Sequence, residues 1–195
     1  MEDAEIDAAA RLFFEVGTLK MLPRTGWFQC GVQRPESIAE HSFRTAYIAM
    51  VLAGLEGADP VRAAGLALVH DTQESRVGDI PHLWRKYLTA ASNEAVTADQ
   101  MNGLPAEVAE VFTGLVRDYE HDGSLEVLVA HEADKLECLI QAVEYRDSGH
   151  RNVESFITTM RQRLTTKSAQ RIADAAVAMS SQAWLAHAST QAADA

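Results

Sequence analysis

The sequence predicts an all-α fold, a helical bundle formed by a single domain. Apolar residues recur every three or four positions along almost the whole chain, as in the run from Ile6 to Leu19. Helix-start patterns separate these runs, and the stretch 37–40 is one of them. No segment shows the alternation of apolar and polar residues that is typical of a strand, and no internal repeat is visible.

The first third of the chain is expected to form two helices joined by a loop. The first helix should run until Pro23, and the glycines and prolines of 23–35 predict a loop. The stretch 37–40 (Ser-Ile-Ala-Glu) matches a capping box, which begins a helix with His41 in its first turn. That helix should end near Gly57.

The next helix is expected to begin at Asp59-Pro60, where a capping residue precedes a proline in the first helical position. Its apolar pattern continues to His70-Asp71, and the helix should break near Gly78. A short turn then follows.

The rest of the chain also shows helical patterns. Helices are expected around 83–87, 93–101 and 105–119, a long one from Ser124 through Val143, and one or two more between 153 and 188. We therefore predict one domain over 1–188 with no linker, followed by a frayed tail over 189–195.

Charge and composition restrict the classes of function. The 195 residues are 47% hydrophobic, enough for a globular core, and the net charge is −11, from 17 basic and 28 acidic residues. An acidic surface repels nucleic acid, although a local arginine or bound cation can still hold a small phosphorylated substrate. The two cysteines lack CxxC spacing, the N-terminus lacks a signal pattern, and no apolar run approaches the ~20 residues that cross a bilayer. We expect a soluble, cytoplasmic protein with no nucleic-acid or membrane partner.

Three helices are expected to bring a His or an Asp into the core. His70-Asp71 ends the apolar run AAGLALVHD, Asp134 interrupts the apolar run VLVAHEADKLECLI, and His41 lies in a capped first turn. Glu74 follows His70 by four residues and can project to the same side of the helix. A buried carboxylate usually pairs with a cation or binds a metal. The set predicts one divalent ion, with Mn, Co, Fe, Ni, Zn and Mg as candidates.

Each of these residues has an ordinary structural explanation when it is taken alone. His70 could be a core histidine with satisfied hydrogen bonds, Asp71 could cap a helix or pair with Arg76, and Asp134 could pair with Lys135. Their joint occurrence in this order favours a metal site.

The joint order resembles the HD superfamily of metal-dependent phosphohydrolases, and it is most similar to the 5′-deoxynucleotidase branch. The matching blocks are LPRTGW at 22–27, RPESIAEHS at 34–42, HDTQESRVGDIP at 70–81, ADKLEC at 133–138 and QAVEY at 141–145. The resemblance spans about 12–145.

The resemblance implies an all-helical HD-domain bundle, commonly a homodimer, that releases phosphate from deoxyribonucleoside 5′-monophosphates. It implies that the metal ligands are His41, His70, Asp71 and Asp134. It implies that Glu74 orients or deprotonates the attacking water, or protonates the leaving 5′-oxygen. The substrate contacts that it implies are Arg24 on the phosphate, Trp27 on the sugar, Asp79 with its turn, and more weakly Asp118.

Several alternatives stay open. Trp27 could be a core aromatic residue, Arg24 a solvated loop residue, and Asp79 a turn residue. An HD-type phosphodiesterase or a di-iron oxygenase would need further histidines, for which the candidates are His82, His121 and His131. A non-catalytic nucleotide-binding protein is disfavoured, because all four ligand residues and Glu74 are present.

Overall fold

The computed structural model describes residues 2–193, and every regular element in that range is a helix. The α-helices are α1 Asp3–Gly17, α2 Ile38–Glu56, α3 Pro60–Val69, α4 Glu74–Val77, α5 Asn93–Gln100, α6 Ala106–His121, α7 Leu125–Asp147, α8 Glu154–Gln162, α9 Lys167–Ala178 and α10 Ala183–Ala193. Three 3₁₀ helices accompany them: η1 Thr18–Lys20, η2 Thr25–Cys30 and η3 Arg151–Val153. The prediction of an all-α fold is confirmed.

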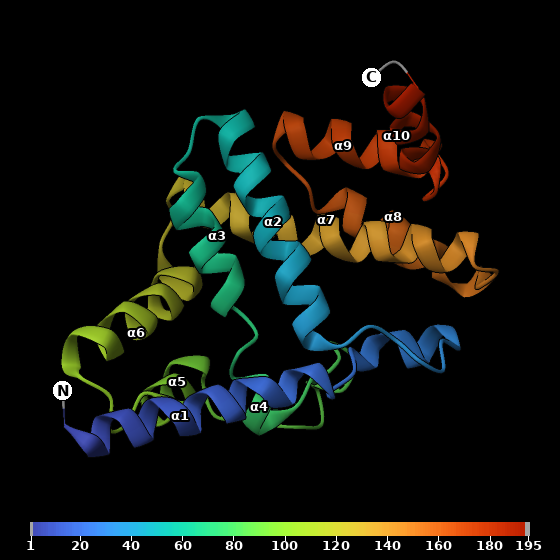
Figure 1. Ribbon diagram of the computed structural model, residues 1–195. Helices are drawn as coiled ribbons and strands as arrows, with labels where there is room; N and C mark the ends of the chain where they lie inside the picture. Colours follow the sequence, from blue (N-terminus) through green and yellow to red (C-terminus); the bar gives the residue numbers. More distant parts are fainter. Residues whose placement is uncertain (1, 194–195) are drawn as a thin grey trace.

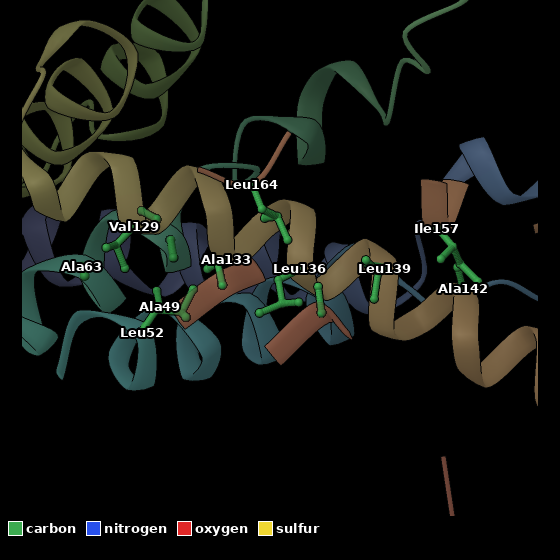
Figure 2. Packing of buried hydrophobic residues seen from close by; sticks show 14 of the residues in the cluster. Ala49, Leu52, Ala63, Val129, Ala133, Leu136, Leu139, Ala142, Ile157 and Leu164 are labelled. Atoms are coloured by element: carbon green, nitrogen blue, oxygen red, sulfur yellow. The ribbon is translucent and has the colours of Figure 1, made fainter. Parts of the chain in front are cut away.

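The long helix α7 forms the centre of the core. Helices α2, α3, α8 and α9 all pack against it, and α2 also packs against α3 (Figure 1). The contact surfaces combine small and large apolar side chains, among them Ala49, Leu52, Ala63, Ala133 and Leu136 (Figure 2). Alanines at these positions let the helix backbones approach closely while the leucines fill the remaining space.

The helix boundaries around the first core pair follow the predicted capping signals. The Ser37 side chain accepts a hydrogen bond from the backbone of Glu40, whose own side chain bonds back to Ser37. Gly57 ends α2 in the left-handed conformation, with a φ of 79° that favours glycine. Asp59 then caps α3 by accepting from the backbone N–H groups of Val61 and Arg62.

The prediction that α3 continues through His70-Asp71 to Gly78 is wrong in detail. Helix α3 ends at Val69, residues 70–73 form a turn, and α4 follows as a separate single turn. The Thr72 hydroxyl and the Gln73 amide both donate to the carbonyl of Val69, at 2.9 and 3.3 Å. These side chains satisfy the last carbonyl of α3 and compete with a continuing helix.

Four other segments differ from expectation. The first helix does not run until Pro23, because α1 ends at Gly17 and η1 follows it. Residues 25–30 form η2 rather than an irregular loop, and 83–87 form turns rather than a helix. Leu83, Trp84 and Tyr87 are exposed, so packing against the core does not stabilise a helix over 83–87. Helix α10 continues through Ala193, into the tail that was expected to be frayed, and 194–195 lie outside the described residues.

Between residues 2 and 193, no helix is both long enough and apolar enough to cross a lipid bilayer.

Candidate active site

Four side chains from α2, α7 and the turn after α3 converge on one point. The Nε2 atom of His41 lies 3.3 Å from Asp134 Oδ1 and 3.7 Å from Asp71 Oδ2. The Nε2 atom of His70 lies 3.1 Å from Asp71 Oδ2 and 4.0 Å from Asp134 Oδ1. The structure thus brings together all four residues that were predicted as metal ligands.

The hydrogen bonds of the two histidines direct their Nε2 atoms toward the carboxylates. Nδ1 of His70 is 2.6 Å from the Ala67 carbonyl, and Nδ1 of His41 is 2.6 Å from Glu137 Oε2. Since both acceptors require a proton on Nδ1, Nε2 carries the lone pair in each neutral ring. Nε2 of His70 is buried and has no hydrogen-bond partner. Lone pairs and carboxylate oxygens this close together fit a divalent cation, and His41, His70 and Asp71 by themselves offer ligand atoms within 4.8 Å of one another.

Close charges shift the pKa values of His41 and Asp71 in opposite directions. Burial and the nearby Arg24 lower the pKa of His41, but Glu137 and Asp134 raise it to about 10. Burial alone would raise the pKa of Asp71, yet His70 and Arg24 hold it well below its usual range. Both shifts therefore come from opposite charges held close together around Asp71 and His41.

Arg24 lies against the carboxylates of Asp71 and Asp134 rather than in solvent. Its Nη1 donates to Asp71 Oδ2 at 2.7 Å, and its Nη2 is 3.8 Å from Asp134 Oδ1. Only 16% of its side chain is exposed. A guanidinium in this place can bind a phosphate next to the ligands.

Asp79 holds the segment that carries Arg24. Its Oδ2 accepts from the backbone N–H of Thr25 at 2.5 Å, and the Thr25 hydroxyl donates to the Asp79 carbonyl at 2.9 Å. Asp79 also lines the cavity in front of the ligands. Its contacts therefore position the Arg24 loop as well as the turn after Gly78.

Trp27 is buried and also forms part of the cavity wall. Its ring lies 5.1 Å from Tyr145 and 4.7 Å from Phe156, and its indole N–H donates to Glu36 at 2.9 Å. It lines the same cavity as Arg24. The indole can therefore pack in the core and contact a substrate in the cavity at the same time.

Asp118 is not among the side chains that line the site. It pairs with Arg62 at 3.0 Å and borders neither of the two cavities next to the ligands.

Two cavities, of about 530 and 470 Å³, open beside the ligands and share Asp71 and Glu74 in their walls. Glu74 Oε2 is buried and has no hydrogen-bond partner. Burial and the charge of Asp71 raise the pKa of Glu74 to about 9. A buried carboxyl group between the ligands and both cavities suits proton transfer at the site.

Two of the three histidines that were candidates for a dinuclear site have hydrogen-bond partners elsewhere. Nε2 of His131 lies 3.0 Å from the Tyr119 carbonyl, and Nε2 of His121 lies 2.7 Å from a Glu94 carboxylate oxygen. His82 lines the smaller cavity.

The sequence analysis did not predict the ion pair between Glu137 and Arg44 next to His41. Glu137 is fully buried and accepts from Arg44 Nη2 at 2.7 Å as well as facing His41 Nδ1. Arg44 also bonds Glu144 at 2.8 Å. A usable signal was present, because Glu137 and Arg44 each follow a predicted ligand by three residues on the same helix.

Comparisons with known proteins show the family of the chain. A model of the HD domain family matches residues 16–176. The chain is 36% identical to the human protein named 5′-deoxynucleotidase HDDC2 over 139 residues, covering 70% of this chain and 67% of the human protein. A protein of the same name from Dictyostelium discoideum is 36% identical over 149 residues, covering 71% of this chain and 78% of that protein.

Solved structures also match. The PH0347 protein from Pyrococcus horikoshii OT3 superposes with a TM-score of 0.69 at 34% identity, covering 86% of this chain and 98% of that one. A predicted metal-dependent phosphohydrolase from Magnetospirillum magnetotacticum shares the fold, with a TM-score of 0.65 at 22% identity over 90% of this chain and 94% of that one. By the extent of the family match and the identity to these relatives, the chain belongs to the HD domain family.

Proposed function

We propose that the protein is a metal-dependent phosphomonoester hydrolase that releases phosphate from deoxyribonucleoside 5′-monophosphates. The names of its relatives support the substrate class. The observation that carries the proposal is the pair of imidazole Nε2 atoms facing two carboxylates directly beside Arg24. That arrangement combines ligands for a cation with a group that binds phosphate.

His41, His70, Asp71 and Asp134 would hold one divalent ion, which when bound lowers the pKa of a water molecule and neutralises charge on the phosphoryl group. His41 and His70 are oriented for this role by Glu137 and by the Ala67 carbonyl.

The chain's own residues supply the remaining steps. Arg24 would bind the phosphate with guanidinium N–H groups that now donate to Asp71. Glu74 would take a proton from the attacking water or give one to the leaving 5′-oxygen. Trp27 would pack on the sugar, and Asp79 would hold the Arg24 loop against the substrate.

A phosphate-release screen tests the function. The substrates are deoxyribonucleoside, ribonucleoside and sugar monophosphates, each assayed with Mn, Co, Fe, Ni, Zn and Mg. We expect release from the deoxyribonucleotides with at least one metal and none after chelation. Lack of release from every deoxyribonucleotide with every metal would overturn the proposal.

The number of ions per chain separates this function from a dinuclear phosphodiesterase or oxygenase. We expect one ion per chain in metal analysis of purified protein. Two ions would favour the dinuclear alternative.

We further propose that the protein is cytoplasmic, a homodimer, and a single domain. Apolar side chains of α1 and α2 support the dimer, because Phe13 is 73% and Phe43 70% exposed in the single chain. Monomers seldom leave so much contiguous apolar surface in water.

A further inference from the structure

Two side chains of α8 and one directly after it form part of the wall of the smaller cavity, and we call these three residues the α8 wall. Phe156, Met160 and Arg163 line this cavity together with Arg24, Asp71 and Asp134. Phe156 and Met160 are four positions apart and share one side of α8, and Arg163 follows three positions later as the C-cap. This face lies beyond residue 145, where the recognisable sequence blocks end.

The α8 wall is fixed to the same helix that supplies Asp134. The buried carboxylate of Glu132, two residues before Asp134, accepts hydrogen bonds from both the backbone N–H and the hydroxyl of Thr165 and of Thr166. Ile157 and Leu164, which directly follow Phe156 and Arg163 in the sequence, are buried in the core (Figure 2). The distance between the wall and the ligands is therefore set by packing and hydrogen bonds.

The residues that line the cavity include two groups of different chemistry. One group is Arg24 with the carboxylates of Asp71 and Asp134. The other group is an aromatic ring, a thioether and a guanidinium, of which Arg163 is exposed and Phe156 is half-buried. Aromatic and thioether groups pack on flat rings, and a guanidinium donates to ring nitrogens and carbonyls but accepts nothing.

We propose that Phe156, Met160 and Arg163 bind the nucleobase of the substrate, with Phe156 and Met160 against its face and Arg163 donating to its edge. The assignment rests on the proposed function, which places the phosphate at Arg24. A guanidinium matches the O6 and N7 acceptors of guanine best, so dGMP is the preferred substrate.

The test compares dGMP with 2-deoxyribose 5-phosphate, which has the same phosphate and sugar but no base. We expect Arg163→Ala to lower kcat/KM for dGMP about tenfold, mainly through KM, and to leave 2-deoxyribose 5-phosphate unchanged. Arg161→Ala is the matched control, because Arg161 lies two residues before Arg163, pairs with Asp174 at 2.6 Å and does not line this cavity. It should leave both substrates unchanged.

A second variant tests the face of the base. Met160→Ala should reduce kcat/KM for dGMP several-fold and again spare 2-deoxyribose 5-phosphate. Equal losses on the two substrates would overturn the inference, since the residue would then act on the phosphate or the fold. No loss on either substrate would also overturn it. Should the wild-type protein release phosphate from neither compound, the proposed function itself fails, which is a distinct result.

Discussion

At the scale of single residues, the histidines of the site share one arrangement. Nδ1 of each is bonded away from the cluster, to Glu137 or to the Ala67 carbonyl, and Nε2 faces the carboxylates of Asp71 and Asp134. The unpartnered Nε2 of His70 in a buried position would otherwise cost free energy. The arrangement accordingly favours a bound cation.

Replacement of one ligand should release the ion. We expect Asp71→Ala to purify without the metal that the wild-type protein carries, because the remaining three ligands lose the carboxylate nearest to His70. Inductively coupled plasma mass spectrometry measures the occupancy. Asp118→Ala is the control, since Asp118 pairs with Arg62 outside the cavities. Full occupancy and turnover in Asp71→Ala would contradict the ligand assignment.

Glu74 should matter for turnover and not for metal binding. We expect Glu74→Ala to keep its ion and to bind substrate while kcat falls by about two to four orders of magnitude, the usual scale for lost acid–base catalysis. Steady-state kinetics and metal analysis on the same preparation measure both effects. A variant that arrives without metal would show that Glu74 is a ligand.

Trp27 should control selectivity against ribonucleotides. An indole beside the sugar leaves no room for a 2′-hydroxyl. A pocket that lacks space in this way discriminates against the larger substrate by ~1–3 kcal/mol, which is roughly a tenfold to a few hundredfold preference in kcat/KM for the deoxyribonucleotide over the ribonucleotide. Trp27→Ala should shrink the preference for deoxyribonucleotides, whereas Arg24→Ala should weaken both substrates alike.

The burial of Trp27 affects how this prediction is measured. Truncation to alanine in the core costs about 3–5 kcal/mol of stability, so Trp27→Phe, which keeps an aromatic ring against Tyr145 and Phe156, is the better variant. The ratio of kcat/KM for dGMP and GMP is the readout. An unchanged ratio would assign Trp27 to the core alone.

At the scale of elements, the single turn α4 depends on its neighbours. A four-residue helix has little stability of its own, yet it carries Glu74. Glu15 on α1 accepts from Arg76 at 2.7 Å, from Gln100 on α5 at 2.9 Å and from Ser75 at 3.2 Å. Helices α1 and α5 therefore hold α4 through one carboxylate, and Figure 1 shows α1 lying beside them.

Loss of the Glu15 charge should weaken the hydrogen bonds that hold α4, and the effect on stability should depend on pH. Hydrogen bonding to Arg76 lowers the pKa of Glu15 to about 2, against the opposing effect of burial. Because the pKa of Glu15 is lower in the folded protein than its ordinary value of 4.5, its charge stabilises the folded state at pH values above 4.5. This stabilisation disappears as the pH falls toward 2. We expect Glu15→Gln to lower the free energy of unfolding by roughly 1–2 kcal/mol at pH 7.

Urea denaturation of both proteins at pH 7 and at successively lower pH measures this difference. The difference in the free energy of unfolding between the wild-type protein and Glu15→Gln should become smaller below pH 4.5. Asp7→Asn, a change of an exposed carboxylate on the same helix, serves as the control. A difference in the free energy of unfolding that stays constant across this pH range would show that the charge of Glu15 does not contribute to holding α4.

At the scale of the whole molecule, an apolar groove crosses α1, α2 and α3. Phe13, Phe43 and Leu68 line it and are 73%, 70% and 53% exposed. Such a surface would be covered by a second copy of the chain in the proposed homodimer.

A charge in this groove should dissociate the dimer. We expect sedimentation equilibrium to give twice the 21.3 kDa chain mass for the wild-type protein and a dimer weakened at least tenfold by Phe43→Asp. Metal content should stay unchanged, because Phe43 lies outside the site. Trp184→Ser, a change of an exposed aromatic residue on α10, is the control. A monomeric wild-type protein at micromolar concentration would contradict the proposal.

Much of the fold could be predicted because the signals involved are local. Apolar spacing predicts a helix from residues within two turns, and capping at Ser37 and Asp59 depends on atoms two or three residues away. The end of α3 at Val69 escaped prediction because it depends on how Thr72 and Gln73 direct their side chains, which the spacing does not report.

The sequence by itself determined the helical class and the helix starts at Ser37 and Asp59, and the joint order of His41, His70, Asp71 and Asp134 indicated the four residues that converge. Only the tertiary structure decided the contacts that cross between elements. Arg24 reaches Asp71 across 47 positions, and Glu137 meets His41 across 96. The α8 wall likewise depends on how α8 packs on α7. Helix periodicity says which side of a helix is buried, whereas the neighbour it meets is set by how all the helices pack together.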